Sequence, residues 1–227
     1  MIGTDQRSTK VVKNVENYVI TIARGFGSGG KQIGKLLASQ LGIPCYESQI
    51  PQMASECSGI SQEKFMQADE RLRRPSLLRL IRKAPDIDRA YAPSDRKFVS
   101  DDNLFRIQAW IIRELAKSKP CIIIGKCANH ILRDWANVLS VYVEAPRKTC
   151  VESIMQKSGV TAEQANKLIV KTDQYRAEYY KYYTGGDDWT NPTLYDLTVN
   201  TGRLSREDAA RLIIQAARIK FGEDALY

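Results

Sequence analysis

The sequence has a single histidine, His130, and its five cysteines are scattered, with no C-x-x-C pair among 227 residues. One histidine argues against catalysis by a histidine pair or triad. An odd number of separated cysteines argues against a disulfide framework and against a zinc site. We therefore expect a protein with reduced thiols, for which the cytoplasm is the simplest location.

Long apolar runs are also missing. No run reaches 18 residues, so the sequence predicts no membrane span. The first seventeen residues lack the apolar core of a secretory signal and are expected to form a flexible lead-in. The remainder, residues 18–227, is long enough for one α/β domain, and its 43% hydrophobic and 26% charged content is ordinary for a globular protein.

The net charge of +8, from 34 basic and 26 acidic residues, allows two interpretations. A basic protein can present a surface to nucleic acid, or it can be an enzyme with polyanionic substrates. The basic residues are spread along the chain and are not interleaved with aromatic residues in one block. We therefore expect no nucleic-acid partner and no membrane partner.

The segment Tyr18–Leu41 reads as a buried strand, a glycine-rich turn and an amphipathic helix. Gly25-x-x-x-x-Gly30-Lys31 has the phosphate-loop (Walker A) spacing and occurs between a strand and a helix, as that motif requires. Glycines let the backbone approach a phosphate, successive N–H groups form an anion nest, and the helix start adds the positive end of its dipole. The predicted donor-binding residues are Gly25, Gly27, Ser28, Gly29, Gly30, Lys31 and Gln32. The alternative is a glycine-rich turn of another α/β domain.

Further strands are expected at 45–47, 121–124, 138–143 and 195–200, each alternating with helical segments. Such alternation predicts a parallel sheet with helices on both faces, and ligands then bind at the carboxyl ends of the strands. Asp102 or Asn103 is the expected cap of the helix before residue 121, and Thr161-x-x-Gln164 is expected to be a capping box that begins a long helix. The last helix is expected to begin at Ser205 and to bury one side, which carries Ala209, Leu212, Ile213, Ala216 and Ile219.

The segment from Lys171 to Trp189 combines cations, four clustered tyrosines and a terminal Gly185–Gly186 pair. Phosphoryl transfer needs cations that cover the transferring group and exclude water, which a mobile basic helix and loop would supply as a lid. The alternative is a solvated charged helix whose tyrosines pack inward.

Five stretches together resemble the cytidylate kinase-like family of P-loop kinases, and the likeness extends from about Tyr18 to Ile219. They are GFGSGGKQIGKLLASQLG, CIIIGKCANHIL, VYVEAPRKTCVESIM, KTDQYRAEYYKYYTG and YDLTVNTGRLS. The resemblance implies a P-loop kinase fold with a helical acceptor-side lobe, near residues 46–102, and a basic lid, near residues 171–189. It also implies ATP-dependent phosphorylation of CMP or dCMP, with Mg²⁺ as the usual companion of ATP.

The same resemblance implies roles for individual residues. Lys31 would contact the ATP phosphates, while Asp173 and Arg176 match a D-x-x-R lid element that meets the acceptor and the phosphates. Lys126 stands where the family has a glycine–arginine pair that faces the acceptor's phosphate. Glu144 ends the following strand, near the expected base site.

Several positions depart from the family pattern. Gln32 replaces the Ser or Thr that helps to hold Mg²⁺, and Lys126 replaces an arginine and so loses its planar fork. Glu47 opens a Glu-Ser-Gln run where the family often has Asp-Arg/Lys-Glu, and no clear Asp for Mg²⁺ follows residues 121–124. These departures bear on the acceptor more than on the donor.

Our leading hypothesis is a cytoplasmic, ATP- and Mg²⁺-dependent phosphotransferase that acts on a pyrimidine nucleoside monophosphate. Lys31, Lys171 and Arg176 would stabilise the migrating phosphoryl group, and Asp173 would orient the lid or a ribose hydroxyl. The first rival is a kinase of another small molecule, with Glu47 or Glu144 as the base for a hydroxyl acceptor. The others are a non-catalytic nucleotide-binding switch and, third, a nucleic-acid binder. The oligomeric state stays open, with a homodimer among the options.

Overall fold

The computed structural model describes residues 17–71 and 90–226, and side chains are described outside residues 68–71. The expected lead-in before residue 17 lies outside this range. So does the part of the expected acceptor-side lobe between residues 72 and 89.

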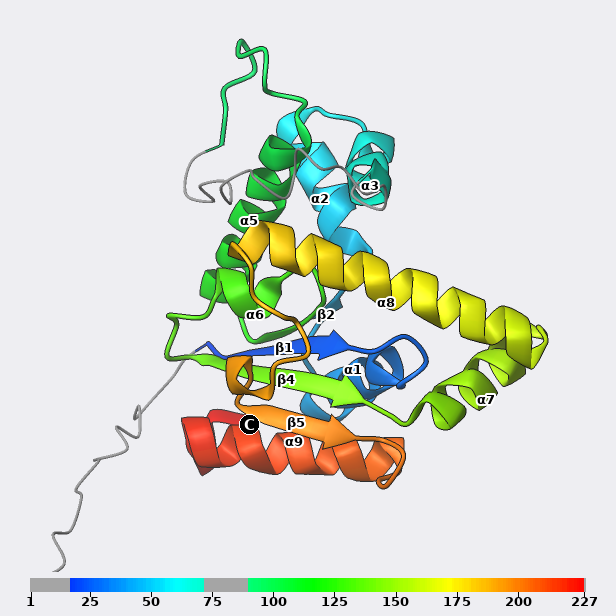
Figure 1. Cartoon of the computed structure of the whole chain (residues 1–227). Helices are drawn as coiled ribbons and strands as arrows, with labels where there is room; N and C mark the ends of the chain where they lie inside the picture. Colours follow the sequence, from blue (N-terminus) through cyan, green and yellow to red (C-terminus); the bar gives the residue numbers. More distant parts are fainter. Residues whose placement is uncertain (1–16, 72–89, 227) are drawn as a thin grey trace, which may run out of the picture.

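The described chain contains one five-stranded parallel sheet in the order β2-β3-β1-β4-β5 (Figure 1). The strands are β1 (Val19–Arg24), β2 (Cys45–Tyr46), β3 (Cys121–Ile124), β4 (Val138–Glu144) and β5 (Leu197–Asn200). In the central register Val19 of β1 lies opposite Cys121 of β3 and Val138 of β4. The expected parallel α/β sheet is confirmed.

The helices alternate with the strands. They are α1 (Gly30–Leu41), α2 (Gln49–Ser58), α3 (Gln62–Arg71), α5 (Asp101–Ser118), α6 (Ala128–Ile131), α7 (Arg147–Ser158), α8 (Ala162–Thr184) and α9 (Arg206–Phe221), with short 3₁₀ turns η1 (Pro192–Leu194) and η2 (Glu223–Leu226). The longest, α8, begins with the predicted capping box, in which the Thr161 hydroxyl accepts from the Gln164 N–H and the Gln164 side chain accepts from the Thr161 N–H.

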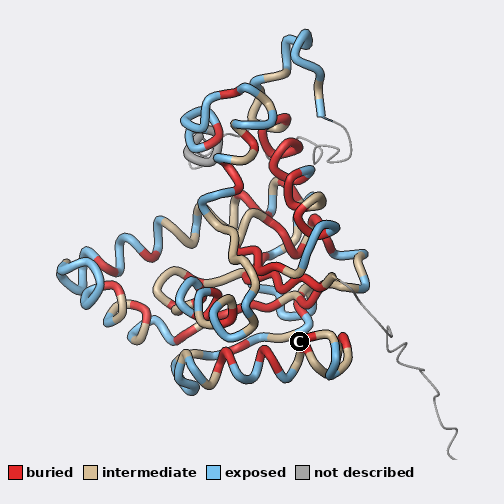
Figure 2. The backbone as a smooth tube through the Cα atoms, turned by 180° about the vertical axis from the view of Figure 1, so that it is seen from behind, coloured by how far each residue is buried: buried red, intermediate tan, exposed pale blue. Residues whose placement is uncertain are grey.

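Two apolar clusters cover the two faces of the sheet. Ile20 and Ile22 of β1 point toward α1 and α9, where they meet Ile33 and Ile213. On the opposite face Val19 belongs to a cluster that α5, α6 and the last turns of α8 complete, and that extends to Phe65 of α3. Figure 2 shows this buried interior and, away from it, the exposed tip where α7 meets α8. The face under α5 and α8 is the one that holds the site.

Three local expectations were wrong in detail. The cap of α5 is Ser100, whose hydroxyl accepts from the Asn103 N–H, because Asp101 and Asp102 already lie in the first turn. The strand β5 begins at Leu197 and not at Tyr195, since η1 occupies the residues just before Tyr195. In α9, Ile219 is 80% exposed, and the buried side is turned toward Ala210, Ile214, Ala217 and Phe221.

No helix within the two described ranges is both long enough and apolar enough to span a bilayer.

The central position of β3 gives a direct test of the core. Ile122→Ala removes a fully buried side chain, and we expect it to lower the free energy of unfolding by about 2–5 kcal/mol. The matched control is Ile219→Ala, at an exposed position on α9, for which we expect a change of about 0.5 kcal/mol or less. Urea denaturation of the two variants measures both values, and equal losses would contradict the described burial.

Candidate active site

The glycine-rich loop lies between β1 and α1 and has the backbone that a phosphate site needs. Gly27 and Gly29 have φ values of 92° and 89°, in the left-handed region that favours glycine. No side chain caps α1, so its first N–H groups are left to face a ligand. A carbon atom added at Gly25 would come within 2.5 Å of a Glu144 carboxylate oxygen, so the loop is also closely packed. The loop and the start of α1 therefore have the backbone geometry that binds an anion.

Ser28 fixes the shape of this loop from inside. Its buried hydroxyl lies 2.9 Å from the Gly25 carbonyl and 3.0 Å from the Val143 carbonyl. The Thr201 hydroxyl, just after β5, donates to the Ser28 carbonyl at 2.6 Å. The Ser28 side chain therefore braces the loop against β4 and β5, and its expected part in donor binding is confined to its backbone.

Lys31, the first-turn lysine of α1, is paired with Glu47, which follows β2. The Lys31 Nζ atom is 2.5 Å from one Glu47 carboxylate oxygen, and Arg24 Nη2 is 3.1 Å from the other. Burial raises the pKa of Glu47, but the hydrogen bond from Lys31 and the charge of Arg24 outweigh burial and hold that pKa below its usual value. Glu47 is therefore a carboxylate bridging two cations.

Helix α8 brings Asp173 and Arg176 onto the glycine-rich loop. The Phe26 N–H donates to Asp173 Oδ1 at 2.8 Å, and Arg176 Nη1 donates to the Arg24 carbonyl at 2.8 Å. The two side chains also pair with each other at 3.3 Å. Burial raises the pKa of Asp173, and burial lowers the pKa of Arg176 to about 10. The D-x-x-R spacing thus places a carboxylate and a guanidinium on one face of α8, against the loop.

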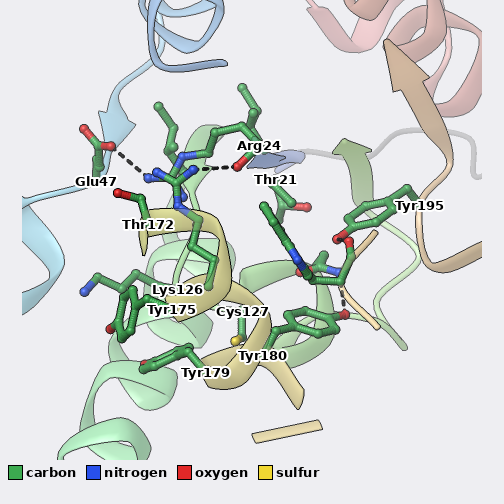
Figure 3. Close-up of a pocket in the computed structure, with 17 residues that line it drawn as sticks. Thr21, Arg24, Glu47, Lys126, Cys127, Thr172, Tyr175, Tyr179, Tyr180 and Tyr195 are labelled. Carbon is green, nitrogen blue, oxygen red and sulfur yellow. Dashed lines mark hydrogen bonds and ion pairs between the residues drawn. The ribbon is translucent and has the colours of Figure 1, made fainter. Parts of the chain in front are cut away.

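A cavity of about 240 Å³ opens beneath these residues (Figure 3). The cations Arg24, Lys126 and Arg176 line it. Aromatic side chains from α8 and from the segment after it also line it, namely Tyr175, Tyr179, Tyr180, Trp189 and Tyr195.

Two polar groups reach the floor of this cavity. The Thr21 hydroxyl of β1 is buried and has no hydrogen-bond partner within the described residues. Beside it, Asn129 of α6 donates to the Tyr180 hydroxyl at 2.9 Å. An unpaired buried hydroxyl is costly unless a ligand or water completes it, so the floor is suited to a ligand with polar atoms.

The loop after β3 is held in an unusual conformation. Lys126 and Cys127 have φ values of 59° and 54°, a region that side chains other than glycine seldom adopt. Residues kept in such regions cluster at ligand sites. Here the turn brings both Lys126 and the buried Cys127 to the lining of the cavity.

Not all of the predicted site residues come together. Arg176, Lys126 and Glu47 line the cavity, and Asp173 contacts the loop beside it. Lys171 is exposed on α8 and does not line the cavity. Glu144 lies beside Gly25, where it accepts from the Tyr142 hydroxyl and the Ala145 N–H, and it is also absent from the cavity wall.

Sequence reasoning missed Arg24 and the aromatic residues that line the cavity. Arg24 ends a strand and precedes the motif, and a charged residue at that boundary could have been noted as a signal. Trp189 and Tyr195 carry no such signal, because they reach the cavity only through the fold.

The described residues contain no group of three or more His, Cys, Asp or Glu side chains suited to a metal ion. Mg²⁺ in kinase sites is usually bound through one or two carboxylates plus the substrate's phosphates, and it keeps several waters. Glu47 lies beside Lys31, and the amide of Gln32 is exposed in the same turn. These residues fit a metal that arrives with the nucleotide.

Comparisons with known proteins agree with this geometry. The model of the cytidylate kinase-like family matches residues 19–203. The cytidylate kinase of Aeropyrum pernix is 28% identical over 193 residues, which are 85% of this chain and 94% of that protein. The cytidylate kinase of Methanopyrus kandleri is 26% identical over 210 residues, which are 88% and 93% of the two chains. Among solved structures, an uncharacterized protein from Eubacterium ventriosum has the same fold, with a TM-score of 0.65 and 23% identity, covering 88% of this chain and 98% of that one.

The opposite pKa shifts of Glu47 and Asp173 predict opposite effects of pH on stability. The lowered pKa of Glu47 means that its stabilising contribution is complete above the pKa of the unfolded chain and is lost as pH falls through the folded value. The raised pKa of Asp173 means that its charged form is disfavoured in the fold, so stability is lost as pH rises from the unfolded value through the folded one.

Urea denaturation of wild type, Glu47→Gln and Asp173→Asn between about pH 3 and pH 7, a range that begins below the ordinary carboxyl pKa values, tests this contrast. The stability advantage of wild type over Glu47→Gln should grow as pH rises, while that over Asp173→Asn should shrink. Slopes of the same sign would contradict the described environments.

Proposed function

The chain belongs to the cytidylate kinase-like family and is therefore a phosphotransferase, and on this premise we propose that it uses ATP and Mg²⁺ to phosphorylate CMP or dCMP. We also propose that the protein acts in the cytoplasm and has no nucleic-acid or membrane partner. The five free cysteines are in keeping with a reducing compartment.

One observation carries the choice of acceptor: cations and aromatic side chains line the same cavity. Lys126 and Arg176 suit a phosphate, and the aromatic side chains, Tyr175 among them, suit a planar base (Figure 3). The unpaired Thr21 hydroxyl on the floor suits a base edge that carries hydrogen-bonding atoms. A volume of about 240 Å³ favours a small acceptor.

On the donor side, the loop amides and the start of α1 would cradle the ATP phosphates, with Lys31 on the β- and γ-phosphates. Gln32 and Glu47 would face Mg²⁺ through its waters. Bound there, Mg²⁺ would supply positive charge next to the phosphates of ATP.

The protein supplies little covalent chemistry in this reaction. An oxygen of the acceptor's phosphate is already an anionic nucleophile, so catalysis consists of positioning and charge stabilisation. Arg176 would contact the transferring phosphoryl group, Asp173 would hold α8 on the loop, and Lys171 would add charge from solvent. We propose residues 171–189 as the lid and the part of the chain near 46–102 as the acceptor-side lobe.

The rival with a hydroxyl acceptor needs a general base, and two observations count against it. Glu47 is paired with Lys31 and Arg24, and its lowered pKa makes it a weak base. Glu144 accepts from the Tyr142 hydroxyl and does not line the cavity.

The proposal is tested by ADP production from ATP·Mg²⁺ against a panel of nucleoside monophosphates and small hydroxyl acceptors, with Lys31→Ala as the blank. We expect turnover with CMP or dCMP that the blank lacks. Turnover with a hydroxyl acceptor alone would replace the proposed acceptor. ATP binding without any turnover would replace the enzyme by a nucleotide-binding switch.

Arg176→Ala tests the role of α8 separately. Removing a preorganised cation from a transferring group lowers kcat by about 10²–10³-fold in typical enzymes, and we expect a loss of that order here. The control is Lys167→Ala, at an exposed position on the same helix that lies before the proposed lid and does not line the cavity. An Arg176→Ala enzyme with full kcat would remove the assignment.

A further inference from the structure

Arg24 is a buried cation that the motif and the family resemblance leave without a role. It is the last residue of β1, directly before Gly25, and its side chain is only 18% exposed. The guanidinium lies against the backbone at Gly125, where any side chain on the glycine would overlap it. Both strand ends are therefore shaped to admit this one side chain between β1 and β3.

The guanidinium does not face an apolar surface. It lines the cavity together with Lys126 and Arg176, and its carbonyl accepts from Arg176 (Figure 3). Burial lowers the pKa of Arg24, which reflects the cost of keeping its charge away from water. A charge that is costly to bury needs an anion beside it.

In the protein without ligand, that anion is Glu47. One of its carboxylate oxygens meets Arg24 Nη2 at 3.1 Å, and the other meets Lys31 Nζ at 2.5 Å. One group with two anionic oxygens thus spans a guanidinium and the lysine of the glycine-rich loop. A phosphoryl group offers its oxygens to the same kinds of donor, and an arginine fork matches them well.

Arg24 and Lys31 both pair with the single carboxylate of Glu47. The neighbouring carboxylate of Asp173 already accepts from the Phe26 N–H and from Arg176. An anionic ligand that displaced Glu47 would therefore meet two cations.

We propose that Arg24 is a further catalytic residue, which together with Lys31 binds the phosphoryl group during its transfer, and that Glu47 is the counter-ion that ATP displaces from Lys31. This inference rests on the proposed kinase function. In the step, the bond between the γ-phosphorus and the β–γ bridging oxygen breaks, and its electron pair stays on ADP. An acceptor oxygen forms the new bond to phosphorus, and Arg24 stabilises the charge on the equatorial oxygens.

The first arm of the test measures kcat and KM for ATP in wild type, Arg24→Met and Arg24→Lys, with CMP as acceptor or with water when CMP is not phosphorylated. We expect Arg24→Met to lose about 10²–10³-fold in kcat, as for other preorganised donors to a transferring group, with the KM for ATP changed only a few-fold. Arg24→Lys should recover only part, because an ammonium lacks the fork. Arg211→Met, on an exposed side chain of α9, is the matched control and should match wild type.

Thermal unfolding of each variant separates catalysis from folding. Arg24→Lys with unchanged Tm and reduced kcat supports the proposal even where Arg24→Met fails to fold. Full kcat in Arg24→Lys or in Arg24→Met overturns it. So does a loss confined to variants whose Tm has fallen to the assay temperature, since a brace between β1 and β3 would explain that result.

The second arm measures the binding of ATP without Mg²⁺ by calorimetry, so it depends neither on the acceptor nor on any contact of Glu47 with the ion. Glu47→Gln removes the competing carboxylate, so ATP should bind several-fold more tightly than to wild type. An unchanged or weaker affinity overturns the displacement of Glu47. Binding that follows this pattern without transfer to any nucleotide would remove the proposed acceptor and leave the counter-ion role standing.

Discussion

The structure depends on a concentration of positive charge at the carboxyl ends of β1 and β3. Arg24 and Arg176 are both largely removed from water there, and their carboxylate partners come from β2 and α8. Buried ion pairs are costly to assemble and costly to break singly. Electrostatic interactions therefore hold the sheet, the glycine-rich loop and α8 together where they meet. The two arginines also make this place suited to a phosphate.

Close backbone packing is what makes this concentration of charge fit. Gly25 leaves room for the Glu144 carboxylate, Gly30 for the start of the Arg24 side chain, and Gly125 for its guanidinium. Each glycine is needed because another element approaches it, and only at Gly125 of these three is the backbone also in the left-handed region. The chain thus uses glycine both to form an anion nest and to admit charged side chains between the strands.

The sequence predicted those parts of the molecule that are determined by neighbours in the chain. The strand–loop–helix unit from Tyr18, the capping box at Thr161 and the buried run Cys121–Ile124 all depend on local pattern and were confirmed. Parts that depend on contacts between distant segments were harder to predict from the sequence. Phe26 and Asp173 are 147 residues apart in sequence, and the contact of the loop with α8 follows only from the path of the sheet.

The errors have physical causes of the same kind. Ser100 and Asp102 are both able to cap a helix, and which one does so depends on where α5 enters the core through Leu104 and Phe105. Arg24 was overlooked because a strand end gives no sign of the direction of its side chain, which the opening above Gly125 decides.

The packing of α8 limits how a lid could work. The last turns of α8 are fixed in the core by Tyr179 and Tyr183, and the Tyr183 ring stacks on Phe105 with centroids 3.7 Å apart. The first turns, together with α7, are mostly exposed and join only a small apolar cluster (Figure 2). The segment proposed as the lid therefore includes turns of α8 that are packed in the core, and the turns with few core contacts lie before Asp173. In the proposed mechanism, a nucleotide enters by exchanging Glu47 for phosphate at Lys31, while Tyr179 and Tyr183 stay packed.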